Sequence, residues 1–247
     1  MNRNIHYIYI IALLLLLGAA TPTFAQTIKG NVYGGGEMAK VEGNTNVTLN
    51  SGTVEKDVFG GGEGKLNDDK KTVNMSADVS GTASVTANGT TFTFPTNGID
   101  EAINHNIYGG GNLSCEVNAS NVTINKGILQ AGFLDGDGAS SWGKFIGAVN
   151  AQADNVMQGS VFGGGYGDDP NFGDEDQASS ADIYGNIVLN INSGTYGSVF
   201  GGNNTSGTIS GTITVNIEEA DPSCGMEVGY VYGGGNKAAY TAPNATE

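Results

Sequence analysis

Val58-Phe59-Gly60-Gly61-Gly62 decides how this chain folds, because the same motif returns along the whole sequence. Each copy places a β-branched residue and an aromatic residue before a run of glycines. Further copies occupy residues 32–36, 107–111, 161–165 and 231–235, and 199–203 is a variant that ends in asparagine. A motif that recurs at intervals of a few tens of residues indicates internal repetition and a stacked architecture.

Strand-like segments precede most copies of this glycine motif. In 46–50 and 213–217 apolar residues alternate with Asn and Thr, and this period of two is typical of a half-buried β-strand. Ser51-Gly52 and Ser193-Gly194 then favour turns, because glycine adopts positive φ at little cost. One unit is therefore strand, turn, short strand and glycine corner, and it needs its neighbours to bury its apolar face.

These units predict an all-β fold, and within that class a parallel β-helix, or β-solenoid. The glycine motifs are 26, 49, 54, 38 and 32 residues apart. We interpret the first interval as one turn of the solenoid, the second and third as two turns each, and the last two as one turn with an inserted loop. A β-propeller or β-sandwich is the alternative, although propeller blades have a more uniform length of about 40 to 50 residues. The predicted repeat domain covers residues 26–240, and a tail covers 241–247.

The first 25 residues carry the pattern of a secretory signal peptide. Arg3 supplies a positive charge, residues 8–20 form an apolar run too short to span a bilayer, and Thr23-Phe24-Ala25 supplies small residues before the cleavage site. Cleavage leaves Gln26 as the first mature residue. We therefore expect a secreted protein, extracellular or on the cell surface, with no transmembrane segment in the mature chain.

Removal of residues 1–25 leaves an acidic chain without arginine. Nine lysines face 25 aspartates and glutamates, so the formal mature charge is 9 − 25 = −16. Nucleic-acid backbones are bound through clusters of Lys and Arg, and this composition therefore excludes a nucleic-acid partner. His105 is the only mature histidine, and we interpret it as a surface or hydrogen-bonded residue, because a catalytic triad or a zinc site needs further partners.

Two cysteines, Cys115 and Cys224, are predicted to remain separate, buried thiols. Stacked strands lie about 4.8 Å apart, so residues several units apart exceed the Cα separation of roughly 7 Å that a disulfide tolerates.

The glycine motifs with Ser-Gly-Thr turns, as at Ser51-Gly52-Thr53, resemble the β-helix regions of bacterial secreted and outer-surface proteins of the adhesin and autotransporter-passenger type, within the pectin-lyase-like fold. Phe200-Gly201-Gly202-Asn203 also resembles the Phe-x-x-Asn element of chlamydial polymorphic outer-membrane proteins, whereas their Gly-Gly-Ala-Ile element is absent. The resemblance implies a noncatalytic adhesion or interaction module at a Gram-negative cell surface. Its partners would be host or bacterial surface proteins or glycans, or further copies joined end to end in a larger array.

A carbohydrate-active enzyme on the same fold is the alternative function. Polysaccharide lyases of the pectin-lyase-like class use Arg or Lys as base with calcium-binding aspartates, and the mature chain supplies no arginine. A lysine base with calcium, or a glycosidase with two carboxylates, stays open. No catalytic residue is assigned from the sequence.

The aromatic residues of the glycine motifs occupy equivalent positions and are predicted to stack as a ladder. If the rings face inward, they form part of the core, which is the usual role of apolar residues in repeat proteins. If they face outward, they form a strip that could bind sugar rings or an apolar partner. Trp142 is a separate candidate contact residue. The ladder residues are Tyr33, Phe59, Tyr108, Phe162, Phe200 and Tyr232.

An acidic segment at 166–176 is the candidate metal site. Calcium prefers six to eight oxygen ligands, which several carboxylates on one loop supply in part. The other interpretation of this segment is a solvated acidic loop, and no other cofactor is implied. The candidate ligands are Asp168, Asp169, Asp174, Glu175 and Asp176.

Overall fold

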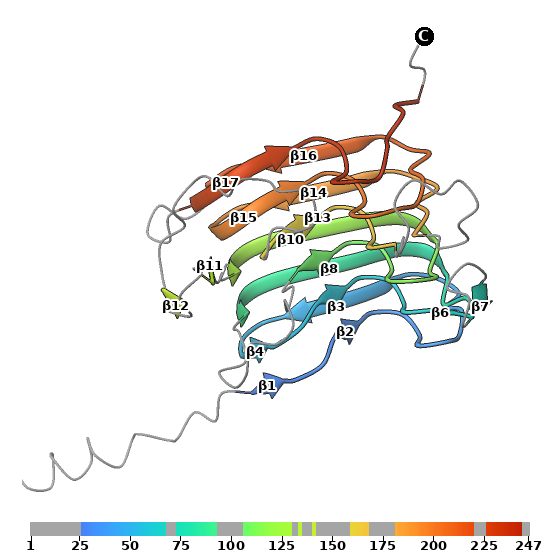
Figure 1. Cartoon of the computed structure of the whole chain (residues 1–247), viewed down its shortest axis with the longest axis horizontal. Helices are drawn as coiled ribbons and strands as arrows, with labels where there is room; N and C mark the ends of the chain where they lie inside the picture. Colours follow the sequence, from blue (N-terminus) through green and yellow to red (C-terminus); the bar gives the residue numbers. More distant parts are fainter. Residues whose placement is uncertain are drawn as a thin grey trace, which may run out of the picture.

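The computed structural model describes residues 26–67, 73–92, 106–129, 133–134, 140–141, 159–167, 181–219 and 226–243. Within these residues the fold is all-β without a helix, and most strand pairs are parallel. Figure 1 shows the strands stacked in order from the N-terminal to the C-terminal end. Among the described residues no helix is long and apolar enough to cross a membrane.

The strands of the glycine motifs form one continuous parallel series. Each pairs with its counterpart in the next copy, so that the two residues before the glycines are always in register. The strands are β2 (Val32–Tyr33), β5 (Val58–Phe59), β9 (Ile107–Tyr108), β13 (Val161–Phe162), β15 (Gly194–Phe200) and β17 (Met226–Tyr232). We call each segment that ends with one glycine motif a layer; the layers are 26–36, 37–62, 63–111, 112–165, 166–203 and 204–235.

Direct pairing along this series corrects our interpretation of the motif spacing. The intervals of 49 and 54 residues do not correspond to two turns each, because Val58 pairs with Ile107 and Ile107 pairs with Val161. Each glycine motif belongs to one layer, and the additional residues lie in the sequence between strands that pair directly. The spacing therefore measures the length of the insertions and not the number of layers.

A second parallel series contains the alternating segments. Its strands keep one register, in which Val47, Val85, Val122, Leu189 and Val215 lie opposite one another. The strands are β3 (Thr45–Leu49), β8 (Val79–Phe92), β10 (Val117–Leu129), β14 (Ile187–Ile191) and β16 (Ile213–Ile217).

Shorter pairings complete each layer. β1 (Thr27–Ile28) pairs with β4 (Thr53–Val54), and this series continues through the ends of β8 and β10 into β15 and β17. Parallel bridges also join Val41 to Val79, Val117 to Ile183 and Ile183 to Ile209. Two antiparallel pairs lie outside the stack order, β6 (Lys65–Leu66) with β7 (Val73–Met75) and β11 (Phe133–Leu134) with β12 (Ser140–Ser141).

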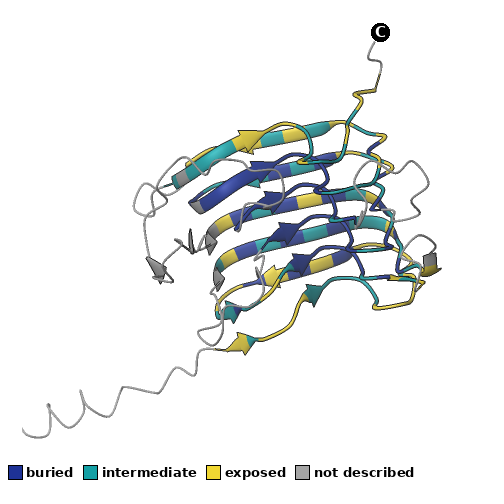
Figure 2. Cartoon of the chain, in the orientation of Figure 1, coloured by how far each residue is buried: buried dark blue, intermediate teal, exposed yellow. Residues whose placement is uncertain are grey.

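The hydrophobic core runs through the middle of the stack. Side chains of β3 alternate between buried and exposed, and β14 alternates between buried and half-buried. Figure 2 shows this banding on successive strands. Val85, Val122 and Leu189 are fully buried at one register position, so each layer covers the apolar residues of the next.

The glycines permit the layers to approach closely at one corner. A Cβ on Gly60 would lie 2.4 Å from the carbonyl oxygen of Gly109, and one on Gly109 would lie 2.3 Å from that of Gly163. Real Cβ atoms do not come this close to backbone oxygen. The corner is also hydrogen-bonded within layers, because the buried hydroxyls of Thr45 and Ser120 donate to the carbonyls of Gly60 and Gly163.

Cys115 carries a buried, free thiol, as predicted, whereas Cys224 lies outside the described residues. The thiol packs behind the glycine corner, and the backbone N–H of Gly62 donates to its sulfur at 3.0 Å. Burial raises the pKa of the Cys115 thiol to about 12. A small side chain is needed here, since a Cβ on Gly111 would lie 2.2 Å from the Cβ of Cys115.

We predict that Gly163→Ala lowers the free energy of unfolding by about 3 kcal/mol, because the new methyl group meets Gly201 and Ile187. Gly233 holds the same position in the last layer, where an added Cβ has no atom within 4 Å. Gly233→Ala should therefore leave the free energy of unfolding unchanged within about 0.5 kcal/mol. Urea titrations at low protein concentration measure both. Equal effects of the two variants would contradict the role of close approach.

We also predict that Cys115→Ala costs less than about 1.5 kcal/mol, because Ala77 and Ala181 fill the equivalent space behind Gly62 and Gly165. Cys115→Val should cost more than about 2 kcal/mol, since its branched Cβ faces Gly111. Thermal melts followed by circular dichroism compare the two. A tolerated valine would show that this corner is not tightly packed.

Candidate functional site

The six motif aromatics form a continuous stacked ladder. Neighbouring ring centroids lie 5.1, 4.7, 4.9, 4.9 and 4.8 Å apart from Tyr33 to Tyr232, and the rings are within 12° of parallel. Phe59, Tyr108, Phe162 and Phe200 are buried, which agrees with the core interpretation. Tyr33 is only partly buried and Tyr232 is exposed, so the ladder reaches solvent at its two ends.

Asparagine side chains hold the tyrosine hydroxyls inside the ladder. The amide of Asn31 and that of Asn112 both donate to the hydroxyl of Tyr33, at 2.9 and 3.0 Å. Tyr108 is held in the same way by Asn106 and Asn204. Burial raises the pKa of Tyr33 to about 12 and also raises the pKa of Tyr108 well above its ordinary value, so both hydroxyls stay protonated near neutral pH.

A second row of polar residues precedes each motif. Its side-chain oxygens accept the backbone N–H of the next layer: Asn31 accepts from Asp57, Asp57 from Asn106 at 2.7 Å, and Asn106 from Ser160. Asp57 is the one carboxyl in this row of four. Burial raises the pKa of Asp57 to about 7, against the hydrogen bond from Asn106 and the charge of Lys56, which lower it.

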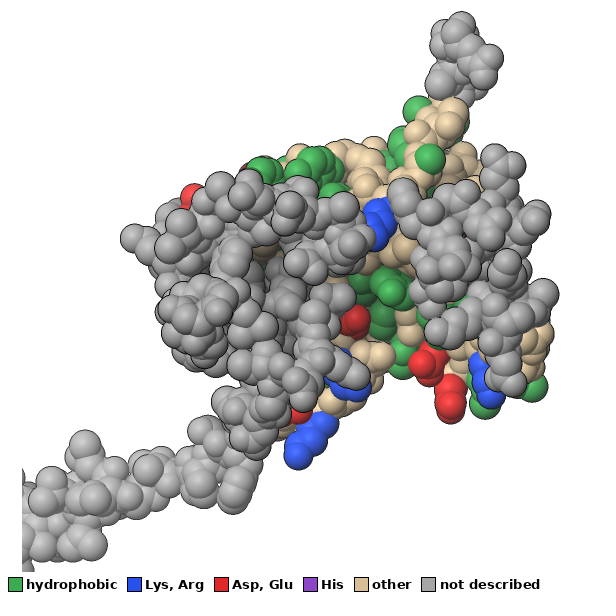
Figure 3. Space-filling view, in the orientation of Figure 1, with side chains coloured by type: hydrophobic (Ala, Val, Ile, Leu, Met, Phe, Trp, Pro, Cys, Tyr) green, Lys and Arg blue, Asp and Glu red, His purple; other side chains and the backbone are tan. Residues whose placement is uncertain are grey.

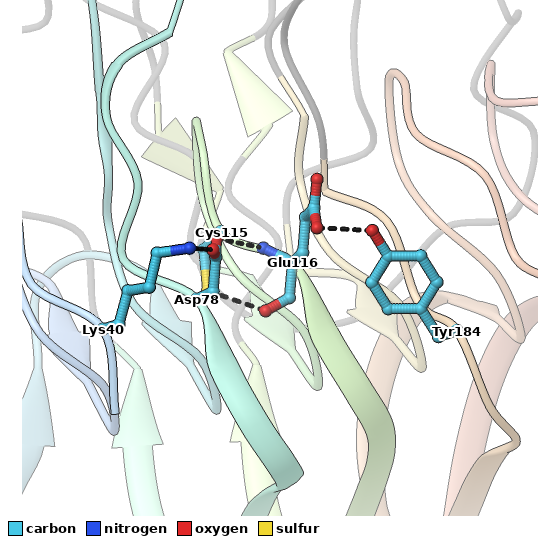
Figure 4. Close-up of polar contacts among 5 residues, drawn as sticks. All are labelled: Lys40, Asp78, Cys115, Glu116 and Tyr184. Atoms are coloured by element: carbon cyan, nitrogen blue, oxygen red, sulfur yellow. Dashed lines mark hydrogen bonds and ion pairs between the residues drawn. The ribbon is translucent and has the colours of Figure 1, made fainter. Parts of the chain in front are cut away.

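Charged side chains form a column where the chain leaves the glycine corner. Figure 4 shows Lys40 beside Asp78, with Nζ and Oδ2 2.7 Å apart, and Asp78 accepting the backbone N–H of Glu116. The hydroxyl of Tyr184 donates to Glu116 at 2.5 Å, and this bond raises the pKa of Tyr184 to about 12. The column is thus internally paired, and it spans four successive layers.

The outward face of the second strand series is mainly polar and uncharged. Asn50, Asn88, Asn125 and Asn192 form a ladder in which each amide donates to the previous side chain at 2.8 to 2.9 Å. Two further rows run parallel to this ladder. One comprises Asn46, Ser84, Asn121, the half-buried Val188 and Thr214, and the other comprises Thr48, Thr86, Thr123, Asn190 and Asn216.

Strand β8 ends at Phe92 and β10 ends at Leu129, and these two residues are paired. The next strands of the motif series begin at Ile107 and Val161, which are also paired, so the intervening segments begin and end at corresponding positions of the described strands. The acidic segment follows Gly167 in the sequence. Trp142, His105 and the five candidate calcium ligands Asp168, Asp169, Asp174, Glu175 and Asp176 lie outside the described residues.

In the part of the chain that the structure describes, no three His, Cys, Asp or Glu side chains come together as a metal site. Figure 3 shows single Lys, Asp and Glu side chains among apolar and uncharged atoms, and no extended basic patch on the described part of that face. Neither a protein-family model, nor a curated protein, nor a solved structure matches the chain.

Sequence reasoning found the aromatic ladder and missed the charged column and the Asp57 row. The charged column is accompanied by a sequence pattern: a small residue, a charged residue and a β-branched residue recur in this order after the glycine motifs. The triplets are 39–41, 77–79, 115–117 and 181–183. They follow their motifs at different distances, so a search at fixed spacing overlooks them.

Asp57 gives a pH-dependent prediction. The pKa of its carboxyl is higher in the folded chain than the ordinary 3.8, so its contribution to stability is complete below about pH 4 and is lost as the pH rises through 7. Asp57→Asn keeps an oxygen acceptor for the N–H of Asn106 and removes the charge. We expect it to raise the free energy of unfolding by about 1 to 3 kcal/mol at pH 8 and to change it little at pH 4.

Urea unfolding at both pH values measures this difference. Asp57→Val, which removes the acceptor as well, should destabilise the protein at both pH values. A gain from Asp57→Asn that is equal at pH 4 and pH 8 would contradict the assignment of a buried carboxylate.

Proposed function

We propose that this chain is an exported parallel β-helix that serves as a noncatalytic adhesion scaffold at the cell surface. The observation that carries the proposal is the use of polar side chains in rows along the stack, such as the asparagine ladder. Such rows stabilise a long, regular surface, whereas catalysis needs groups that converge on one reacting atom. The signal-peptide pattern of residues 1–25 supports export.

Parallel pairing in constant register supports the β-helix. Every layer adds one strand to the motif series, and every layer after the first adds one strand to the second series, in which the apolar positions remain aligned from Val47 to Val215. A propeller would arrange its blades around an axis, with antiparallel strands inside each blade. The described antiparallel pairs, β6 with β7 and β11 with β12, lie outside the stack order.

The chemistry of the outward face favours a neutral, hydroxyl-rich glycan as partner. Amide and hydroxyl groups both donate and accept hydrogen bonds, as sugar hydroxyls do. Asn46, Thr48 and Asn121 are exposed on this face; the first two lie on β3, and Asn121 lies two strands away on β10, beyond Ser84 of β8. The mature charge of −16, from 9 lysines and 25 acidic residues, disfavours acidic polysaccharides.

The test compares binding with turnover. The processed chain, residues 26–247, is incubated with neutral and acidic polysaccharides, and sedimentation with the insoluble polymer is measured beside the release of reducing ends and unsaturated products. We expect reversible binding to a neutral polymer without products. Sustained product release would replace this proposal with the carbohydrate-active enzyme, and failure to bind any polymer would reject the glycan partner.

Variants locate the binding face. Asn46→Asp combined with Asn121→Asp places two charges on the outward face at no change of size, and we expect it to weaken binding by about tenfold. Asn118→Asp is the matched control, because Asn118 is exposed on β10 before its alternating part. Equal effects of the double variant and the control would show that another surface binds the glycan.

A further inference from the structure

The last layer exposes residues that every inner layer buries. Val231 and Tyr232 are 48% and 42% exposed, whereas Val199 and Phe200, their partners one layer below, are 0% and 6% exposed. Figure 3 shows hydrophobic side chains along the upper edge of the molecule, where Figure 1 places β16 and β17. The ring of Tyr232 packs on Phe200 and also contacts Tyr230 of its own strand, with ring centroids 6.2 Å apart. Among the described residues, no strand pairs with β17 on the side away from β15.

The N–H groups of the first two glycines in each motif donate in one direction through the stack, whereas the carbonyl of the third residue accepts an N–H that is donated in the opposite direction, as Gly36 does from Glu63. The first glycine of each motif donates its N–H to the aromatic residue of the next layer, from Gly34 and Phe59 to Gly201 and Tyr232. The second glycine donates to its counterpart, as Gly202 does to Gly234. In the last layer, the N–H groups of Gly233 and Gly234 therefore point to where a further layer would lie.

The first layer presents the complementary groups. Phe59 and Gly61 use their carbonyls to accept from the layer below, and Tyr33 and Gly35 are their equivalents at the N-terminal end. Within the described residues, no layer lies below Tyr33 and Gly35 to donate to these carbonyls. Donors at one end of the stack thus match acceptors at the other, in the same spacing.

The exposed edge lacks the features that usually prevent strand addition. Lys or Pro on an edge strand, or a covering helix, blocks pairing with another chain. β17 contains neither residue, and its glycine corner is open, because a Cβ on Gly233 or Gly234 would meet nothing within 4 Å. In the inner layers the equivalent Cβ atoms would lie within 2.9 Å of an atom of the adjacent layer.

We propose that this edge binds the N-terminal edge of a second copy of the chain, so that the stack continues from one molecule into the next. Tyr33 of the second copy stacks on Tyr232, Val32 lies on Val231, and Ile28 lies on Val228, in the register of the inner layers. The carbonyls of Tyr33 and Gly35 accept from Gly233 and Gly234. The contact joins two different surfaces, so it produces an open series of oligomers and not a closed dimer.

The arrangement of strands in the first layer provides a control position. If β2 of the second copy pairs with β17, the strand β3 of that copy belongs to the following layer, so it does not pair with β16. Ile217 on β16 is 41% exposed, almost as much as Tyr232, yet it lies outside the proposed contact. Ile217→Ser thus removes similar exposed apolar area without touching the contact.

Sedimentation velocity of the processed chain over a concentration series tests the proposal. We expect the weight-average mass to rise continuously with concentration, to at least about twice the monomer mass, as a head-to-tail contact requires. A mass that stays monomeric up to about 0.5 mM would reject the second copy as the partner and leave the edge to another protein. A plateau at a closed dimer would reject the head-to-tail geometry.

Two variants distinguish association through this edge from nonspecific hydrophobic association. Gly233→Val with Gly234→Ala fills the open corner and should weaken association by about tenfold or more, because the new methyl groups meet the backbone of the second copy. The monomer should keep its circular dichroism spectrum and melting temperature. Ile217→Ser should associate like the unaltered chain. Association that survives the glycine substitutions, or that is lost in Ile217→Ser, would overturn the proposed contact.

Discussion

Backbone contact at the glycine corner is the constraint on which the rest of the structure depends. The first glycine of each inner motif has a carbonyl oxygen of the next layer where its Cβ would be, at 2.3 to 2.4 Å. This close approach sets the layer spacing at one corner, and the aromatic rings beside it then stack at 4.7 to 5.1 Å. A Cβ at the corner would separate the layers and with them the rings.

Fixed spacing places equivalent side chains of successive layers against one another, and this restricts their chemistry. An amide can donate to and accept from an identical amide, which explains the row of Asn50, Asn88, Asn125 and Asn192. Carboxylates cannot do this without repulsion. The charged column solves the difficulty by placing Lys40 against Asp78 and a tyrosine hydroxyl against Glu116. Asp57 has no such partner, and burial raises its pKa instead.

The local units of the fold could be predicted from the sequence because they depend on local patterns. Alternation in 46–50 indicates a half-buried strand, and the aromatic before the glycines indicates a stacked position. The layer assignment was wrong for the intervals of 49 and 54 residues, because an insertion can leave a layer without changing its register. The charged column escaped prediction for the same physical reason, since insertions vary the distance between its members. The calcium and Trp142 hypotheses stay predictions.

The direction of the interlayer hydrogen bonds has a mechanical consequence. Most of these bonds run along the stack between adjacent layers. A force that pulls the two ends of the chain apart along the stack is transmitted through every layer, but an outermost layer is held from one side only, so it detaches before the inner layers. Under tension the molecule is therefore expected to unfold from its ends, one layer at a time. Each step releases a length of chain that corresponds to the number of residues in the detached layer.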